Sequence, residues 1–191
     1  MSPLCSDDRR ALLELARWAI VGAVCHDRIP ELAAPTGALA EPSGAFVSLH
    51  FGGRLRGCVG QVRPTGSLAA TVVQCSIGAA RADPRFRPVE ADEVAALEVE
   101  ISVLSDLKPI HPDAIEVGRH GLVVTCGQHR GVLLPQVAVE HHWTRECFLK
   151  ETCAKAGLEP DSWQDPASQL WAFTAEVFSE KDFPTLRRAQ N

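Results

Sequence analysis

The sequence predicts an α+β fold in which antiparallel sheets combine with flanking helices. Three observations carry this prediction: a helical pattern opens the chain, alternating strand patterns follow, and helices and strands occur in irregular order. A doubly wound parallel sheet would instead require regular alternation of strands and helices. The 191 residues, 46% hydrophobic and 23% charged, have the composition of an ordinary globular protein with a sizeable core.

The first helix is expected over about residues 7–26. Leu12 and Leu15 begin an apolar helical spacing, and Ser6 is the expected N-cap, with acidic residues in the first turn. Residues 33–44 are rich in proline, glycine and alanine, which predicts a loop.

The segment AFVSLHF, residues 45–51, predicts a strand with Ser48 and His50 on one face. The glycine pair 52–53 indicates a tight turn, so a second strand near 57–62 is expected to complete a hairpin. The hexamer LRGCVG then lies at the turn and at the start of this second strand.

A second helix is expected from its cap Ser67 to the Asp-Pro pair at 83–84, because proline disfavours helix at the residue before it. The segment LEVEISVLS, residues 97–105, alternates cleanly and predicts a half-buried strand. Its Glu98 and Glu100 share one face.

The C-terminal half begins with short strands interrupted by glycines over residues 115–135. A helical stretch is expected over about 137–157, with Gly157 as its end. The segment LWAFTAEVF, residues 170–178, returns to a strand pattern.

Composition excludes several classes of protein. A net charge of −5, four tryptophans and no tyrosine argue against nucleic-acid binding. The N-terminus has no secretory signal and no apolar run approaches the roughly 20 residues of a membrane span, so a cytoplasmic location is expected. Seven cysteines without a CxxC pair predict reduced thiols, and neither metal-ligand spacing nor a cofactor motif is present.

Six blocks occur in order along the chain: LRGCVG, ARADPRFRPV, LEVEISVLS, IEVGRHGLVV, RGVLLPQVAVEHHW and FLKETCAKAGL. Together they resemble the AMMECR-type domain family, over about residues 46–163. Val59 departs from the hexamer of the family, which more often has isoleucine there, and the loss of one methylene should be tolerated.

The resemblance implies a two-lobe α+β architecture. The larger lobe would comprise about 1–106 and 167–191, with a smaller lobe of about 107–166 inserted in it and the hexamer facing the cleft between them. Prokaryotic members of the family are similar to the A component of the AmmeMemoRadiSam system, which implies Memo-type and radical-SAM proteins as partners. The resemblance does not imply an established biochemical activity.

Two interpretations of Cys58 remain open. A thiolate nucleophile would need a lowered pKa, which Arg56 and a nearby histidine base would provide, and Gly57 and Gly60 would let a ligand approach the backbone. Alternatively, Cys58 is a small buried apolar residue in a strand whose glycines serve a turn or bulge. Arg81, Asp83 and Arg85 are expected to form a turn network whose ion pairs position the hexamer.

His120, in a turn between two short strands, is the candidate base facing Cys58, and its alternative is a structural role. Glu98 and Glu100 would serve as acid and base or hold a metal, or they would pair with Arg56 or Arg81 or face solvent. The predicted site comprises Cys58 and His120 as catalytic residues and Leu55, Arg56, Gly57, Val59, Gly60, Glu100 and Gln136 as cleft or ligand-binding residues.

Two functions follow from this site. The first is binding of a peptide, protein or metabolite in the cleft with thiol-dependent chemistry at Cys58. The second is a non-catalytic adaptor that holds a Memo-type or radical-SAM protein.

Overall fold

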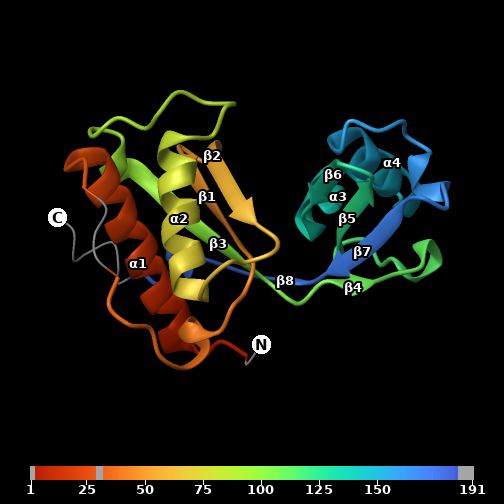
Figure 1. Cartoon of the computed structure of the whole chain (residues 1–191). Coiled ribbons are helices and arrows are strands. Elements are labelled where there is room, and N and C mark those ends of the chain that lie inside the picture. Colours follow the sequence, from red (N-terminus) through yellow and green to blue (C-terminus); the bar gives the residue numbers. More distant parts are fainter. Residues whose placement is uncertain (1–2, 29–31, 185–191) are drawn as a thin grey trace. The chain divides into compact units, whose positions relative to one another are not determined.

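The computed structural model describes residues 3–28 and 32–184 (Figure 1). The chain divides into two compact units: Met1–Leu104 with Glu176–Asn191 form the first, and Ser105–Ala175 the second. Both contain an antiparallel sheet and helices, which confirms the α+β class. The second unit ends at Ala175 rather than near 166, because the strand at 169–173 pairs within its sheet.

The first unit is a four-stranded sheet with two helices on one face (Figure 1). Its strands have the order β2-β1-β3-β8, and β1 pairs antiparallel with both β2 and β3. The elements are α1 (Ser6–Cys25), β1 (Ala45–Phe51), β2 (Arg54–Gln61), α2 (Leu68–Arg81), β3 (Leu97–Leu104) and β8 (Ala175–Ser179).

Helix α1 is capped by Cys5 and not by Ser6, which is its first residue. The Cys5 Sγ accepts the backbone N–H of Asp8 at 3.5 Å, and the Cys5 N–H donates to the Asp8 carboxylate at 2.9 Å. A thiol thus fills the place that a hydroxyl usually takes in a capping box. The predicted cap Ser67 of α2 is confirmed, since its side chain accepts the N–H of Ala70.

The core of the first unit lies between the helices and one side of the sheet. Alternate residues of β1 and β3, among them Val47, Leu49 and Ile101, are fully buried there against Leu12 and Val72 of the two helices. We call this side of the sheet the helix face. The opposite side is called the polar face and carries Ser48, His50, Cys58, Glu98 and Glu100.

The β1–β2 hairpin contains a β-bulge beside its turn. Leu49 pairs with Gly57 and His50 with Leu55, so Arg56 is an extra residue on β2. The strand therefore begins at Arg54, earlier than predicted. Because Cα partners point to the same side, the bulge turns Leu55 to the polar face, whereas strict alternation would place it with Gly57 on the helix face.

The second unit has the strand order β4-β7-β5-β6. Its elements are β4 (Lys108–Pro109), β5 (Gly121–Cys126), β6 (His129–Leu133), α3 (Pro135–Glu140), α4 (Arg145–Lys155) and β7 (Gln169–Phe173). Short 3-10 helices occupy Gly37–Ala40, Val94–Ala96, Pro112–Ala114, Ser162–Gln164 and Glu180–Asp182.

Two predicted elements of the C-terminal half are each divided in the structure. The helical stretch 137–157 is interrupted at His142, whose φ is +53°, and Thr144 caps the next helix. The expected end at Gly157, with φ +72°, agrees with the end of α4 at Lys155. The strand at 170–178 becomes β7 and β8, which belong to different sheets.

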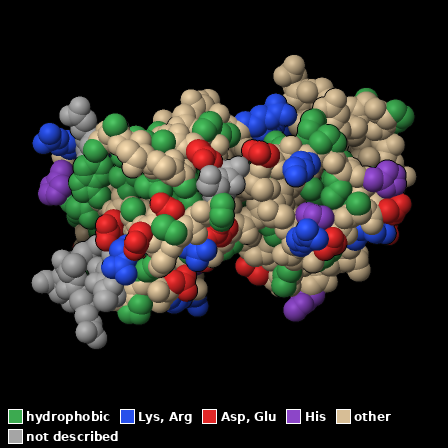
Figure 2. All heavy atoms as spheres, turned by 90° about the horizontal axis from the view of Figure 1, so that it is seen from below, with side chains coloured by type: hydrophobic (Ala, Val, Ile, Leu, Met, Phe, Trp, Pro, Cys, Tyr) green, Lys and Arg blue, Asp and Glu red, His purple; other side chains and the backbone are tan. Residues whose placement is uncertain are grey.

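Where the chain enters and leaves the second unit, Ser105 and Thr174 are joined by two hydrogen bonds. The Ser105 N–H donates to the Thr174 carbonyl and the Thr174 N–H donates to the Ser105 Oγ, each at 2.9 Å. Among the described residues, no helix combines the length and apolar character needed to cross a membrane. Hydrophobic side chains lie at the surface among charges of both signs (Figure 2).

Candidate functional site

Cys58 lies at one end of a row of three side chains across the polar face. Ser48 on β1 is the Cα partner of Cys58 on β2 and of Glu100 on β3. Since Val47 and Leu49 point into the core, the alternation of β1 turns Ser48, and with it the whole row, to the polar face. The predicted residues Cys58 and Glu100 are therefore brought together around Ser48.

The Cys58 thiol accepts a hydrogen bond from a side chain of the neighbouring strand. The Ser48 Oγ donates to the Cys58 Sγ at 3.3 Å. Burial raises the pKa of the Cys58 thiol above its ordinary value, and outweighs the Ser48 hydrogen bond and the charge of Arg85, which favour the thiolate. Burial therefore disfavours the thiolate, and the nucleophilic role expected of Cys58 stays a prediction.

Arg56 does not supply the cation that was expected beside Cys58. Its guanidinium binds the Glu93 carboxylate through two hydrogen bonds of 2.8 Å and also donates to the carbonyls of Arg87 and Pro88. These hydrogen bonds lower the pKa of Glu93 to about 2. Arg56 therefore fastens residues 87–93 to the bulge of β2.

The backbone of Cys58, at the outer edge of the sheet, is covered by two side chains. The Cys58 N–H donates to the Asp83 carboxylate at 2.8 Å, and the Arg85 guanidinium donates to the Cys58 carbonyl at 3.3 Å. Arg85 also binds Asp83, at 2.7 Å and 3.0 Å, and holds the pKa of that carboxyl well below its usual range. The two side chains satisfy the groups that a neighbouring strand would pair.

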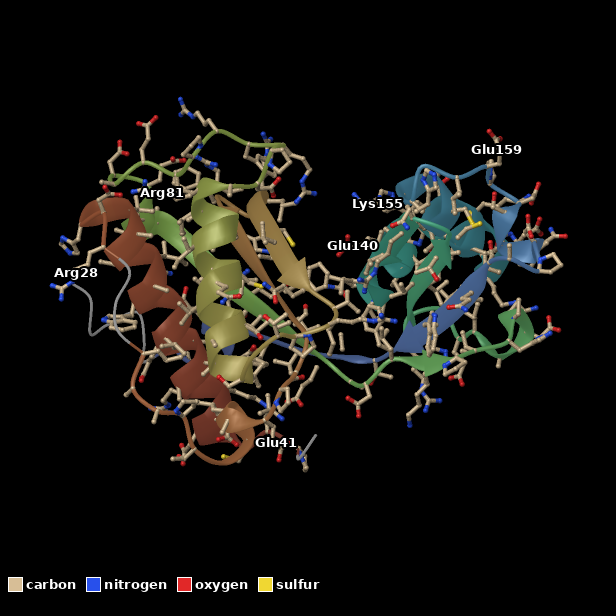
Figure 3. The ribbon with its side chains drawn as sticks, viewed as in Figure 1. Arg28, Glu41, Arg81, Glu140, Lys155 and Glu159 are labelled. Carbon is tan, nitrogen blue, oxygen red and sulfur yellow. The ribbon has the colours of Figure 1, made fainter. Side chains whose placement is uncertain are left out.

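The expected turn network is thus confirmed for Asp83 and Arg85 but not for Arg81. Arg81, in the last turn of α2 (Figure 3), donates to the carbonyl of Ala23 and lies 3.3 Å from the carboxylate of Asp27. It therefore ties the end of α2 to the end of α1, and it does not contribute to the edge of β2 at Cys58.

The glycines of the hexamer are required by packing. A Cβ on Gly57 would lie 2.1 Å from the carbonyl oxygen of Ala79, so β2 and α2 approach as closely as they do because the residue is glycine. A Cβ on Gly60 would lie 2.2 Å from the ring of Phe46. Val59 packs against the core from the helix face, so the architectural interpretation applies to these three residues.

His50 is the histidine that shares the polar face with Cys58. It follows Ser48 on the same side of β1 and is the Cα partner of Leu55 and Glu98. Its Nε2 is buried and has no hydrogen-bond partner among the described residues. Glu98 forms an ion pair of 2.7 Å with Lys181.

His120 and Gln136 belong to the second unit. The Nδ1 of His120 accepts the N–H of Glu116 at 3.0 Å, which gives it a role in its own turn, and Gln136 lies in the first turn of α3. Their expected approach to Cys58 stays a prediction. The described residues also contain no group of three or more histidine, cysteine or acidic side chains arranged to hold a metal ion.

Sequence reasoning missed Ser48 as the partner of the thiol. The signal was present, because the alternation of AFVSLHF places Ser48 and His50 on one face. Only the register between β1 and β2 shows that Cys58 is opposite Ser48. That register cannot be predicted from the sequence, because the bulge shifts it by one residue.

Comparisons with a family model, with related sequences and with a solved structure all point to the same family. The AMMECR1 family model matches residues 13–178. A protein of Methanothermobacter thermautotrophicus is 39% identical, over 94% of this chain and 97% of its own, and one of Thermococcus gammatolerans is 44% identical over 89% of each chain. The crystal structure of the uncharacterized protein PH0010 from Pyrococcus horikoshii has a TM-score of 0.85 and 41% identity over 90% of both chains. The chain therefore belongs to the AMMECR1 family.

Proposed function

We propose that the polar face around Leu55–Gly60 binds a segment of a partner protein without turnover. The observation that carries this proposal is the state of Cys58: its thiol is partly exposed, accepts a hydrogen bond from Ser48 and is kept protonated by burial. A protonated thiol beside a hydroxyl suits recognition better than nucleophilic attack, for which the thiolate is the reactive form.

Leu55 supplies the apolar anchor of the proposed site. It is 40% exposed, and the bulge at Arg56 turns it to the same face as Cys58 and His50. Bulges commonly re-aim a side chain beside a functional site, and an apolar anchor bordered by polar groups is typical of protein recognition. The Nε2 of His50, on the same face, is buried and has no hydrogen-bond partner among the described residues.

The resemblance of the sequence names the partners to test first, a Memo-type protein or a radical-SAM protein. The site as proposed needs only residues of the first unit. The expected cleft between two lobes, with His120 opposite Cys58, is an extension of this proposal that requires the second unit as well.

The test is affinity capture from the native host with wild-type protein and with Leu55→Asp as bait. Loss of a captured partner with Leu55→Asp, but not with Val139→Asp, is the expected result, because Val139 is 51% exposed in the second unit. Cys58→Ser, which keeps a small hydrogen-bonding group, should retain the partner. A partner that is captured equally by Leu55→Asp would contradict the proposed site.

Thiol-dependent chemistry at Cys58 is the second candidate. It is favoured by His50, whose unpartnered Nε2 lies on the same face. Diagonal positions of this kind are roughly 7–8 Å apart between Cα atoms, within reach of an imidazole. If a host extract modified Cys58, and His50→Gln abolished the modification while partner capture persisted, the enzyme interpretation would replace the adaptor.

A further inference from the structure

A hollow of about 750 Å³ lies in the first unit between α1 and residues 91–97. Its lining includes Glu14, Trp18, Val21 and Cys25 from α1, with Ala95 and Leu97 on the other side. Cavities that bind small molecules commonly measure about 300–1,000 Å³. The hollow shares no lining residue with the polar face.

The frame of the hollow is held by Arg17, which is buried at 5% exposure. Its guanidinium donates to the carbonyls of Val94 and Leu97, at 2.7 Å and 2.8 Å, and to the Glu180 carboxylate at 2.9 Å. Because Glu180 balances its charge, Arg17 does not make the hollow an anion site. It fixes the 94–97 segment to α1 and so keeps the hollow formed in the absence of a ligand.

Glu14 gives the hollow its uncompensated charge. It is exposed, and it has neither a hydrogen bond nor an ion pair with any other side chain in the part of the chain that the structure describes. Arg17 is the only other lining residue from the described part with a permanent charge, and it is neutralised as above. The described lining therefore presents a net negative charge above an apolar floor.

Trp18 stands one helical turn from Glu14 and is 42% exposed. Residues at i and i+4 share a helix face, so the indole and the carboxylate border the same hollow. The face of a tryptophan attracts cations more strongly than that of any other side chain. An indole, a carboxylate and an apolar floor of Val21 and Leu97 together are complementary to a cation with an apolar body.

We propose that this hollow binds a small organic cation, an ammonium or guanidinium group on an aromatic or aliphatic body. The charged group would lie between Glu14 and the Trp18 ring, and the body would contact Val21, Ala95 and Leu97. The volume of the hollow fits a free small molecule, and the negative charge of Glu14 favours a positively charged one. The site is independent of the function proposed for the polar face.

The test uses 2-phenylethylammonium as probe, with 2-phenylethanol and 3-phenylpropionate as neutral and anionic compounds of similar body. Four tryptophans give four indole N–H signals in an NMR spectrum, and Trp18→Phe assigns the one of interest. A saturable shift of the Trp18 signal with the cation, weaker binding of the alcohol and none of the anion are expected. Equal binding of all three compounds, or no saturable shift, would overturn the proposal.

Two variants test separately the charge of Glu14 and the volume of the hollow. Glu14→Gln should raise the Kd of the cation about five- to tenfold and leave that of the alcohol unchanged. Glu159→Gln, at an exposed residue of the second unit (Figure 3), is the matched control and should change neither. Ala95→Phe should abolish binding of both by filling the hollow. An unchanged Kd in Glu14→Gln would overturn the role of the carboxylate.

A further binding measurement distinguishes a free amine from a protein side chain as the occupant of the hollow. N-acetylarginine amide carries the cation of a protein segment without its chain. It should bind more weakly than 2-phenylethylammonium, because its body is more polar. If it bound more tightly, the occupant would be a basic segment of a protein and the small-molecule proposal would fail.

Discussion

The two faces of the first sheet use the same strands for different purposes. On the helix face, Val47 and Leu49 are fully buried and contribute to a continuous apolar core. On the polar face, Ser48 from the same strand donates a hydrogen bond to Cys58, and the Nε2 of His50 has no hydrogen-bond partner among the described residues. Neighbouring residues of β1 therefore differ in role: those on the helix face stabilise the core, and those on the polar face belong to the proposed recognition site.

The residues of the hexamer are divided between the two faces. Gly57 and Val59 alternate to the helix face and belong to the packing, whereas Leu55 and Cys58 are on the polar face. The hexamer therefore contributes residues both to the packing and to the site proposed on the polar face. Substitutions at adjacent positions can separate the two.

The largest effect is expected for Gly57→Ala on the helix face. The new Cβ would lie 2.1 Å from the Ala79 carbonyl oxygen, so β2 and α2 would have to move apart. We expect a loss of about 3 kcal/mol or more in the free energy of unfolding, measured with urea. Gly66→Ala is the control, because its Cβ would be 3.7 Å from Ala70, and a similar loss there would contradict the explanation.

Leu49→Ala and Ser48→Ala compare the two faces directly. Removal of the fully buried Leu49 side chain should lower the free energy of unfolding by about 3 kcal/mol. Ser48→Ala should cost about 1 kcal/mol or less, since it removes one hydrogen bond to a thiol. Equal costs would show that the polar face is as much a part of the core as the helix face.

Glu93→Gln tests the attachment of the bulge that aims Leu55. The pKa of Glu93 is about 2, below its ordinary 4.5, so its ionised form stabilises the fold above pH 4.5 and this contribution is lost as the pH falls toward 2. At pH 7 the variant should be less stable by on the order of 2 kcal/mol. The difference from wild type should shrink between pH 4.5 and pH 2, and a constant difference would contradict this origin.

The smallest expected effect is a shift in the pH dependence of Cys58 alkylation, which tests the polar face directly. Its alkylation by iodoacetamide, followed by peptide mass spectrometry, should reach half of its maximal rate above pH 9.0, the ordinary thiol pKa. Ser48→Ala should move this midpoint higher, because the Ser48 hydrogen bond lowers the pKa. A midpoint below that of an ordinary thiol would favour the thiolate and the enzyme interpretation.

Local patterns predicted most elements of the fold. The alternation in 45–51 and 97–105 gave both central strands of the first sheet, and Ser67 marked the start of α2 correctly. The misplaced boundaries are those that tertiary contacts decide. Residues 170–178 continue one strand pattern, and only pairing with two different sheets divides them.

The candidate site was less predictable than the fold. The sequence placed Arg56 near Cys58, but the bulge and the acidic partner Glu93, 37 residues away, commit its guanidinium elsewhere. The raised pKa of Cys58 depends on burial, which a hexamer does not reveal. The face on which Glu100 lies was predicted from the alternation of its own strand, because that inference needs no knowledge of strand pairing.

The reciprocal hydrogen bonds between Ser105 and Thr174 make the second unit a modular insertion. Its two ends are hydrogen bonded to each other. A short turn from Leu104 to Ala175 would therefore close the chain without stretching β3 or β8. Such a shortened protein would retain Cys58, Ser48 and the hollow beside α1. The first unit can thus be prepared by itself by deletion, and the contribution of the second unit to capture of the proposed partner can be measured by restoring it.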